Sequence, residues 1–285
     1  MFDNSNVIDA VSLGPRVSAA SSCVIAEADD GCKYVVKWME DRPGTRIALR
    51  EAFGTSVFAA LGILVPAWRP IHISDRLIEA DECKCLDRLD TRTKILPGIH
   101  FGSRCVGGGG ERVYEVIPDN WHQCIRNRAD FWGSLVLDLW LNSSQPRQSL
   151  LITDKDDLEV WTLFVSHSGI SFDPYEKVAS PLNACFHPDL RVYPQNNVMS
   201  SIDYWIDRIR LNGEEAVINA LATLPSAWTT VSSGELGGRV IDRISTLGER
   251  VYGALCAEMK GNSTKAVRSV QASRLHPVGC SALGR

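Results

Sequence analysis

Polar side chains that could do chemistry gather at residues 143–148. This segment reads Ser-Ser-Gln-Pro-Arg-Gln and brings hydroxyl, amide and guanidinium groups together. Residues 130–142 before it place apolar side chains at helical spacing, and two apolar segments after it, 150–152 and 161–165, predict a pair of strands around a polar turn. A buried helix, a polar loop and a hairpin can hold side chains rigidly at a cleft, so we expect a functional site here.

Lys37 and Glu51 are a second candidate. Lys37 lies in an alternating segment that predicts a strand, and Glu51 lies in the next predicted helix. Taken singly, the lysine of such a strand most often faces solvent, and the glutamate is an ordinary surface charge. Taken together they have another interpretation, because a strand lysine paired with a helix glutamate holds nucleotide phosphates in kinase folds.

Three other motifs carry less information. Cys83-Lys84-Cys85 has no second cysteine pair at zinc-site spacing, so we expect free thiols. The glycine run at 107–110 lacks the Lys-Ser/Thr of a phosphate loop, and we interpret it as a connector between lobes. His167 could serve as a general base, although a single histidine at a strand end is more often structural.

The elements that would position these residues follow one another along the chain. The N-terminal part predicts a hairpin, a helix that stops at Gly62, and a further strand, at residues 23–38, 43–61 and 65–73. Residues 1–22 are small and polar, a poor source of core. The C-terminal part predicts two short helices and one long helix, at residues 202–210, 214–224 and 237–259.

Composition excludes several classes of function. The chain has 285 residues, 45% hydrophobic and 22% charged, as expected of a globular protein with a sizeable core. Its net charge of -4 gives no general attraction for nucleic acid or anionic membrane, and its longest apolar run is too short to span a bilayer. Nine cysteines without a visible signal peptide indicate a reducing, cytoplasmic location.

Taken in order, these segments resemble the bacterial HipA-like kinase family, in its compact branch, from about residue 18 to 257. The N-terminal resemblance rests on Tyr-Val-Val-Lys37, Gly44-Thr-Arg46, Glu51 and Leu61-Gly-Ile-Leu-Val-Pro66. The C-terminal resemblance rests on Gly98-Ile-His-Phe-Gly-Ser103, Asp138-Leu-Trp140, Arg147-Gln148, Arg191-Val-Tyr193, and Pro225 with Trp228. No single motif is decisive; the ordered series carries the resemblance.

The resemblance implies an α+β, bilobal, protein-kinase-like fold. A β-rich N-lobe with one helix is expected at residues 1–104, with 1–20 poorly ordered, followed by a linker at 105–117. A mainly helical C-lobe containing the catalytic-loop hairpin is expected at 118–259, and a disordered basic tail at 260–285.

The resemblance also implies a nucleotide cleft in which Lys37, oriented by Glu51, contacts the phosphates. Ser21 and His100 are the other residues expected to bind the nucleotide. Ser21 ends the segment Ser-Ala-Ala-Ser, which stands where the family usually has glycines, and alanine Cβ atoms crowd the approach of backbone to phosphate.

The expected catalytic residues are degenerate. Alignment puts Gln145 at the catalytic aspartate, Ser143 near the asparagine, and Arg147 and Gln148 in the rest of the loop. No Asp or Glu occurs between Leu139 and Thr153, so a small shift of the alignment restores no carboxylate.

The expected metal position is degenerate as well. Ser166 stands at the metal-binding aspartate, with Asp173 as a potential substitute. Asp154 and Asp156 could also substitute, but turn aspartates are far more often solvated. The losses weaken the case for Mg²⁺, which prefers carboxylate and phosphate oxygens.

Three hypotheses follow. The first is a HipA-like pseudokinase, or strongly impaired Ser/Thr kinase, that holds ATP and serves as a binding or regulatory module for an unidentified protein partner or substrate. The alternative is an active phosphotransferase that uses non-standard carboxylates. The second alternative is a non-catalytic interaction module with a vestigial cleft. The pseudokinase hypothesis predicts nucleotide binding that is little changed by magnesium. The active-phosphotransferase hypothesis predicts metal-dependent turnover, and the interaction-module hypothesis predicts no nucleotide binding.

Overall fold

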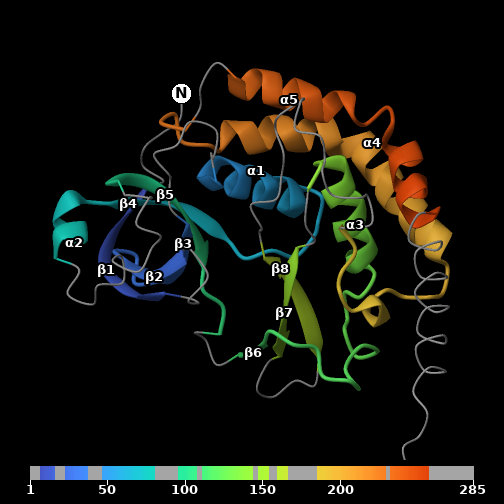
Figure 1. The fold of residues 1–285 in the computed structure, drawn as a ribbon, viewed down its shortest axis with the longest axis horizontal. Coiled ribbons are helices and arrows are strands. Elements are labelled where there is room, and N and C mark those ends of the chain that lie inside the picture. Colours follow the sequence, from blue (N-terminus) through green and yellow to red (C-terminus); the bar gives the residue numbers. More distant parts are fainter. Residues whose placement is uncertain are drawn as a thin grey trace, which may run out of the picture.

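The computed structural model describes a barrel, a small sheet and a set of helices (Figure 1). The residues that it describes are 7–16, 23–37, 47–80, 96–107, 111–143, 147–153, 159–165, 185–228 and 232–256.

Five strands form a closed barrel in the order β1-β2-β3-β5-β4. They are β1 (Ile8–Arg16), β2 (Cys23–Ala28), β3 (Lys33–Lys37), β4 (Trp68–Ile73) and β5 (Gly98–Arg104). The predicted hairpin is confirmed, because β2 and β3 pair antiparallel around Gly31, whose φ is 75°. Apolar side chains from alternating positions of these strands fill a core of their own. Gly102 permits close packing inside it, since a Cβ there would lie 2.3 Å from the side chain of Ile71.

Strand β1 differs from the prediction that residues 1–20 are poorly ordered. It pairs antiparallel with β2 and parallel with β4, through Ile8 and Ile71, and so closes the barrel. Ile8, Ala10 and Leu13 add modest apolar surface to the barrel core. Pairing on both sides satisfies the backbone groups of β1, so the strand needs few large side chains to form.

The predicted helix before Gly62 is confirmed as α1 (Ile47–Ala60). It ends where Gly62 adopts a φ of 84°, with the amide of Gly62 bonded to Ala59 and that of Ile63 bonded to Phe58. This pair of hydrogen bonds is a Schellman motif. The prediction assigned the helix to the β-rich lobe. In the structure α1 packs chiefly against α4 (Val198–Ala222), and its buried side chains belong to the larger core outside the barrel.

A second sheet has the order β6-β7-β8. The predicted pair of strands is confirmed as β7 (Gln148–Thr153) and β8 (Val160–Val165), with Leu150 opposite Leu163. Strand β6 (Arg112–Tyr114) lies inside the predicted linker and pairs with β7.

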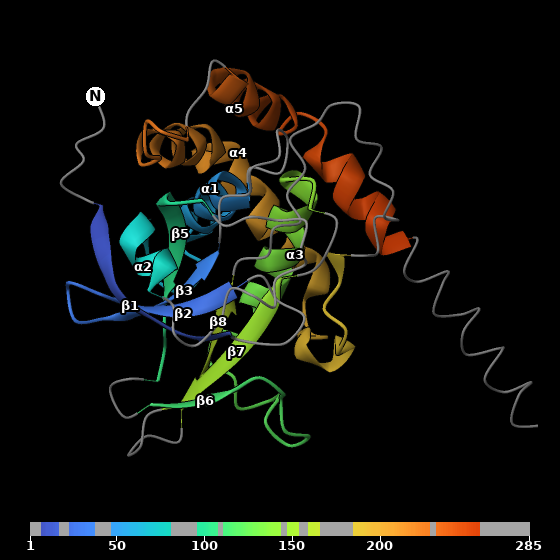
Figure 2. The same ribbon diagram turned by 60° about the vertical axis from the view of Figure 1, so that its left-hand side comes forward.

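The larger core is helical. It joins α1 and α4 to α3 (Asp130–Trp140) and α5 (Ser232–Asp242), while α2 (Asp75–Glu79) and a short 3₁₀ turn (Leu190–Val192) complete the described elements. In Figures 1 and 2, α5, α4 and α1 lie one below another, and the β6–β8 sheet lies below α3. None of the described helices is long and apolar enough to cross a membrane.

Two helix predictions need correction. The helices predicted at 202–210 and 214–224 are one continuous helix, α4. Gly213, between the two predicted helices, is buried within α4, where a Cβ would come within 3.1 Å of both Ile209 and Trp140. The long helix predicted at 237–259 is interrupted by turns at 243–246. The hydroxyls of Ser245 and Thr246 donate to the carbonyls of Asp242 and Arg243 in that interruption.

Candidate functional site

Lys37 and Glu51 form an ion pair between β3 and α1. The Lys37 Nζ lies 2.7 Å from Glu51 Oε1. The glutamate side chain is fully buried, and the lysine side chain keeps 18% of its surface exposed. Burial of a carboxylate is strongly unfavourable unless a cation pairs with it, so the lysine stabilises Glu51 inside the core. The lysine side chain therefore reaches from the buried carboxylate to the solvent-accessible surface.

A second ion pair, not predicted as a pair, joins Asp138 of α3 to Arg147. Arg147 Nε donates to Asp138 Oδ1 at 3.2 Å, and each side chain is 1% exposed. Burial raises the pKa of Asp138 in spite of the opposing charge of Arg147. The guanidinium also lies over the ring of Phe58, 3.5 Å from its centroid. Phe58 belongs to α1, so Arg147 connects α3, α1 and the start of β7.

The two ion pairs form one electrostatic group. Burial lowers the pKa of Arg147, and the negative charges of Asp138 and, to a smaller extent, Glu51 oppose that shift. Glu51 therefore lies close enough to influence two cations, Lys37 and Arg147. Asp138 could have been found from the sequence, because an acid inside the apolar run Leu-Val-Leu-Asp-Leu-Trp-Leu must be buried and must have a partner.

The described start of the predicted catalytic loop is tightly held. Asn142 has a φ of 59°, and the amide of Ser143 donates to the carbonyl of Asp138 at 2.8 Å. The thiol of Cys185 donates to the carbonyl of Ser143 at 3.1 Å, and Ser143 is 4% exposed. Gln148 is exposed at the first position of β7. The structure thus encloses Ser143 and Arg147 while Gln148 faces solvent.

Of the other predicted site residues, His100 is described: it is the chain neighbour of Phe101, which pairs with Lys37 across β3 and β5. His100 is on β5 and is buried, with its Nε2 3.1 Å from the carbonyl of Leu96. Burial lowers the pKa of His100 to about 4, so its ring is neutral at pH 7. Ser21, Gln145, Ser166 and Asp173 lie outside the described residues.

Metal ligands are scarce in the described part of the chain. No group of three or more His, Cys, Asp or Glu side chains is placed there to hold an ion. Asp138, the carboxylate nearest to the predicted loop in sequence, is engaged by Arg147 in the interior. The residues expected to hold a metal, Ser166 and Asp173, lie outside the described residues.

A third cluster binds the 3₁₀ turn to the loop before α3. Arg191 donates to both Asp189 and Asp119 at 2.9 Å, and the ring of His122 lies 2.8 Å from Asp189. Hydrogen bonds from Arg191 and His122 hold the pKa of Asp189 well below its usual range. Around them is a polar cavity of about 400 Å³. Because these charges neutralise one another, we interpret the cluster as structural.

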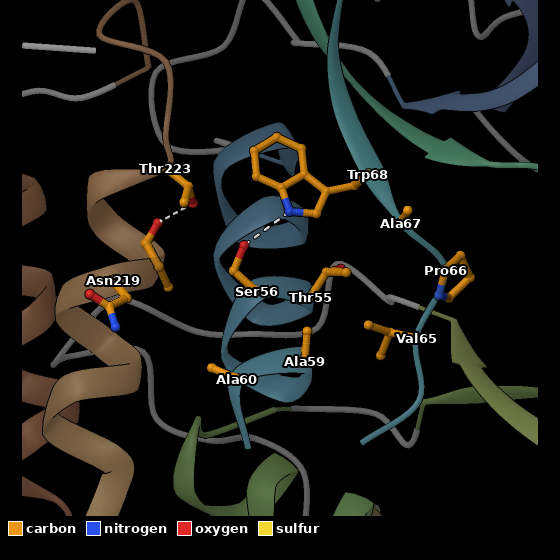
Figure 3. A pocket seen from close by; sticks show the side chains of 11 residues that line it. Thr55, Ser56, Ala59, Ala60, Val65, Pro66, Ala67, Trp68, Asn219 and Thr223 are labelled. Carbon is orange, nitrogen blue, oxygen red and sulfur yellow. Dashed lines mark hydrogen bonds between the residues drawn. The ribbon is translucent and has the colours of Figure 1, made fainter. Parts of the chain in front are cut away.

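An apolar pocket of about 390 Å³ lies between α1, the segment before β4 and the end of α4 (Figure 3). Within the described structure the buried hydroxyl of Thr55 has no hydrogen-bond partner, while Ser56 accepts from Trp68 Nε1 at 2.9 Å. The lining includes neither Lys37 nor Glu51, so this pocket is separate from the ion-pair group.

The chain is similar in structure to kinases. No family model matches the sequence, and no curated protein does. The crystal structure of the Helicobacter pylori proinflammatory kinase CtkA aligns with a TM-score of 0.52 and 11% identity, over 86% of this chain and 98% of that one. At this identity the likeness establishes a kinase-like fold of mixed α and β content.

Two structures of the Golgi casein kinase are less similar. One aligns with a TM-score of 0.48 and 11% identity, over 86% of this chain and 73% of that one. The other, described with Mn/ADP bound, aligns with a TM-score of 0.47 and 12% identity, over 87% of this chain and 73% of that one.

Proposed function

We propose that the protein is a HipA-like pseudokinase, or a strongly impaired Ser/Thr kinase, that binds ATP at Lys37. One observation carries the proposal. In a chain with a kinase-like fold, a lysine at the end of the third barrel strand pairs at 2.7 Å with a buried glutamate of the next helix. A pair of this kind fixes a lysine amine where nucleotide phosphates can meet it.

The residues around this pair support binding better than phosphoryl transfer. The chain between Leu139 and Thr153 contains no carboxylate, so Gln145 is left at the position expected of the catalytic base. An amide can hydrogen-bond a hydroxyl but cannot take its proton as a carboxylate does. When bound, a magnesium ion would neutralise developing phosphate charge, and Ser166 at the expected metal position lacks the charge to hold it.

Calorimetric titration with a non-hydrolysable ATP analogue tests the proposal. We expect binding to the unaltered protein and a loss of about tenfold or more in Lys37→Ala, because a charged hydrogen bond to phosphate contributes about 1.5–3 kcal/mol. Lys33→Ala is the matched control, since Lys33 is exposed at the other end of β3 from Lys37, the lysine that pairs with Glu51. The control should bind as the unaltered protein does.

The same titration with magnesium separates the alternatives. The proposal predicts little change in affinity and no turnover of ATP in parallel samples. Strong magnesium dependence with turnover that fails in Asp173→Ala would replace it with the active-kinase hypothesis. No binding under any condition would leave the interaction-module hypothesis.

A further inference from the structure

The apolar pocket beside α1 has a buried floor and an exposed rim (Figure 3). Thr55 of α1 and Ala220 of α4 belong to the floor and are buried. The small side chains of Ala59, Ala60 and Ala67 belong to the rim and are exposed. A hollow of this kind can be reached from solvent. Its volume of about 390 Å³ falls in the range of about 300–1,000 Å³ that is typical of small-molecule sites.

One wall of the pocket is fixed from several sides. Trp68 Nε1 donates to Ser56 Oγ of α1 at 2.9 Å. The Trp68 ring also stacks on Phe101 of β5 and on Trp228, with centroids 5.8 Å and 6.3 Å apart. Trp228 is itself anchored, since its Nε1 donates to the carbonyl of Ile99 at 3.0 Å. A wall that is already ordered loses little entropy when a ligand binds against it.

The hydroxyl of Thr55 is a polar group that the surrounding protein leaves unsatisfied. Thr55 is 3% exposed, and within the described ranges its buried Oγ1 has no hydrogen-bond partner, not even the carbonyl four residues earlier to which a helical threonine can donate. Figure 3 shows the Thr55 side chain on the side of α1 that faces Val65 and Pro66. A buried hydroxyl without a partner is unfavourable, so a ligand that hydrogen-bonds to it removes an existing cost.

The lining of the pocket decides the charge of its ligand. None of the described side chains that line it is ionisable: they are alanine, valine, proline, serine, threonine, asparagine and tryptophan. An ion would lose its hydration here without meeting an opposite charge, which is strongly unfavourable. The lining therefore selects an uncharged molecule.

We propose that this pocket binds an uncharged, mostly apolar small molecule with one hydrogen-bonding group, which pairs with the Thr55 hydroxyl. The apolar lining supplies affinity by removing ligand surface from water, and the hydroxyl fixes the orientation. Thr55 lies one helical turn after Glu51 on α1. The site does not depend on the proposed nucleotide binding, because neither Lys37 nor Glu51 lines it.

Titration followed by ligand-observed NMR tests the site with two matched probes, indole and indene. Both are uncharged bicyclic molecules, and of the two only indole carries an N–H group. In Thr55→Val the affinity for indole should fall about three- to tenfold, as expected for the loss of a neutral hydrogen bond, while the affinity for indene stays unchanged. Without a probe, Thr55→Val should be at least as stable as the unaltered protein, because valine keeps the shape and removes the unsatisfied hydroxyl.

A second variant tests the place of binding. Ala59→Leu puts a larger side chain at an exposed rim position, so the protein should fold and the affinity for both probes should fall about tenfold or more. Ala80→Leu is the matched control. It changes an exposed alanine at the end of α2, outside the pocket lining, and should bind both probes as the unaltered protein does.

Several results would overturn the proposal. Equal losses of indole and indene affinity in Thr55→Val would do so, as would no loss of either, or no binding of either probe to the unaltered protein. A less stable Thr55→Val without a probe would mean that the hydroxyl has a structural partner. Binding that Ala59→Leu leaves intact would place the probes elsewhere, and indole-3-carboxylate binding as tightly as indole would contradict the selection of uncharged ligands. Self-association that Ala59→Leu abolishes, measured by sedimentation, would assign the pocket to a second copy of the chain instead.

Discussion

At the scale of single residues, buried charge decides which side chains matter. Asp138 and Arg147 are both 1% exposed and are paired at 3.2 Å. Removing one partner of a buried pair leaves the other charge uncompensated, which typically costs about 3–5 kcal/mol. We expect Asp138→Asn and Arg147→Met each to lower the free energy of unfolding by about this amount. The double variant should lose less than the sum, as measured by chemical denaturation.

The exposed pair Arg210–Asp207 on α4 supplies the control. Its side chains are 52% and 64% exposed and lie 3.2 Å apart. Exposed pairs contribute about 0–1 kcal/mol, so Asp207→Asn should be nearly neutral. A cost of Asp138→Asn no larger than that of Asp207→Asn would show that the buried pair does not stabilise the fold.

His100 should make stability depend on pH. Burial lowers its pKa in the folded protein to about 4, below the ordinary 6.5. Between these values the unfolded chain binds a proton that the folded chain does not, so stability falls as pH decreases from 6.5 towards 4. We expect the unaltered protein to lose up to about 3 kcal/mol more than His100→Gln between pH 7 and pH 4. Parallel pH profiles for the two proteins would contradict this.

The sequence indicated the Lys37–Glu51 ion pair but not the ion pair between Asp138 and Arg147. Lys37 and Glu51 lie in consecutive predicted elements, and their relation resembles a known arrangement. Arg147 was assigned to the catalytic loop by its neighbours along the chain, yet its guanidinium packs on Phe58 of α1 and pairs with Asp138. Contacts of that kind depend on how three distant elements meet, which no local pattern specifies.

At the scale of elements, close packing between helices is the strongest constraint. A Cβ on Gly133 of α3 would come within 2.4 Å of the Trp205 ring on α4 and 2.8 Å of Ile63. Gly133→Ala should therefore push α3 and α4 apart and cost about 1–3 kcal/mol, as overpacking does. Gly238→Ala on α5 is the matched control, because nothing lies within 4 Å of its Cβ position.

In an exposed helix, alanine is favoured over glycine by about 1 kcal/mol, so the control should be neutral or more stable. Urea denaturation of both variants measures the difference. Equal stability of Gly133→Ala and Gly238→Ala would mean that the contact between α3 and Trp205 is loose.

Elements with a strong local signal could be predicted, and elements made by tertiary pairing could not. The hairpin β2–β3, helix α1 with its Gly62 stop, and the hairpin β7–β8 each had periodicity and turn residues, and all are present. Strand β1 has no strong apolar pattern that would have predicted it. It forms because β2 and β4 pair with it on either side. Strand β6 has three residues and exists through its pairing with β7.

At the scale of the whole molecule, the described residues form two cores of unequal size. The barrel core contains few buried side chains, whereas the helical core includes α1, α3, α4 and α5. Regions with fewer buried apolar contacts open at a lower free energy. We expect amides of β1 and β2 to exchange with solvent faster than those of α3 and α4, as measured by hydrogen exchange with mass spectrometry. Uniform protection would show one cooperative unit.

The Lys37–Glu51 pair joins these two cores, since β3 belongs to the barrel and α1 to the helical core. The most direct test of the account is labelling with an ATP analogue that carries an acyl phosphate. A lysine amine beside the bound phosphates attacks the acyl carbon, forming an amide and releasing the nucleotide. Peptide mass spectrometry then identifies the labelled lysine. The account predicts labelling of Lys37 that excess ATP prevents, with little labelling of Lys33. Equal labelling of both lysines, unaffected by ATP, would contradict it.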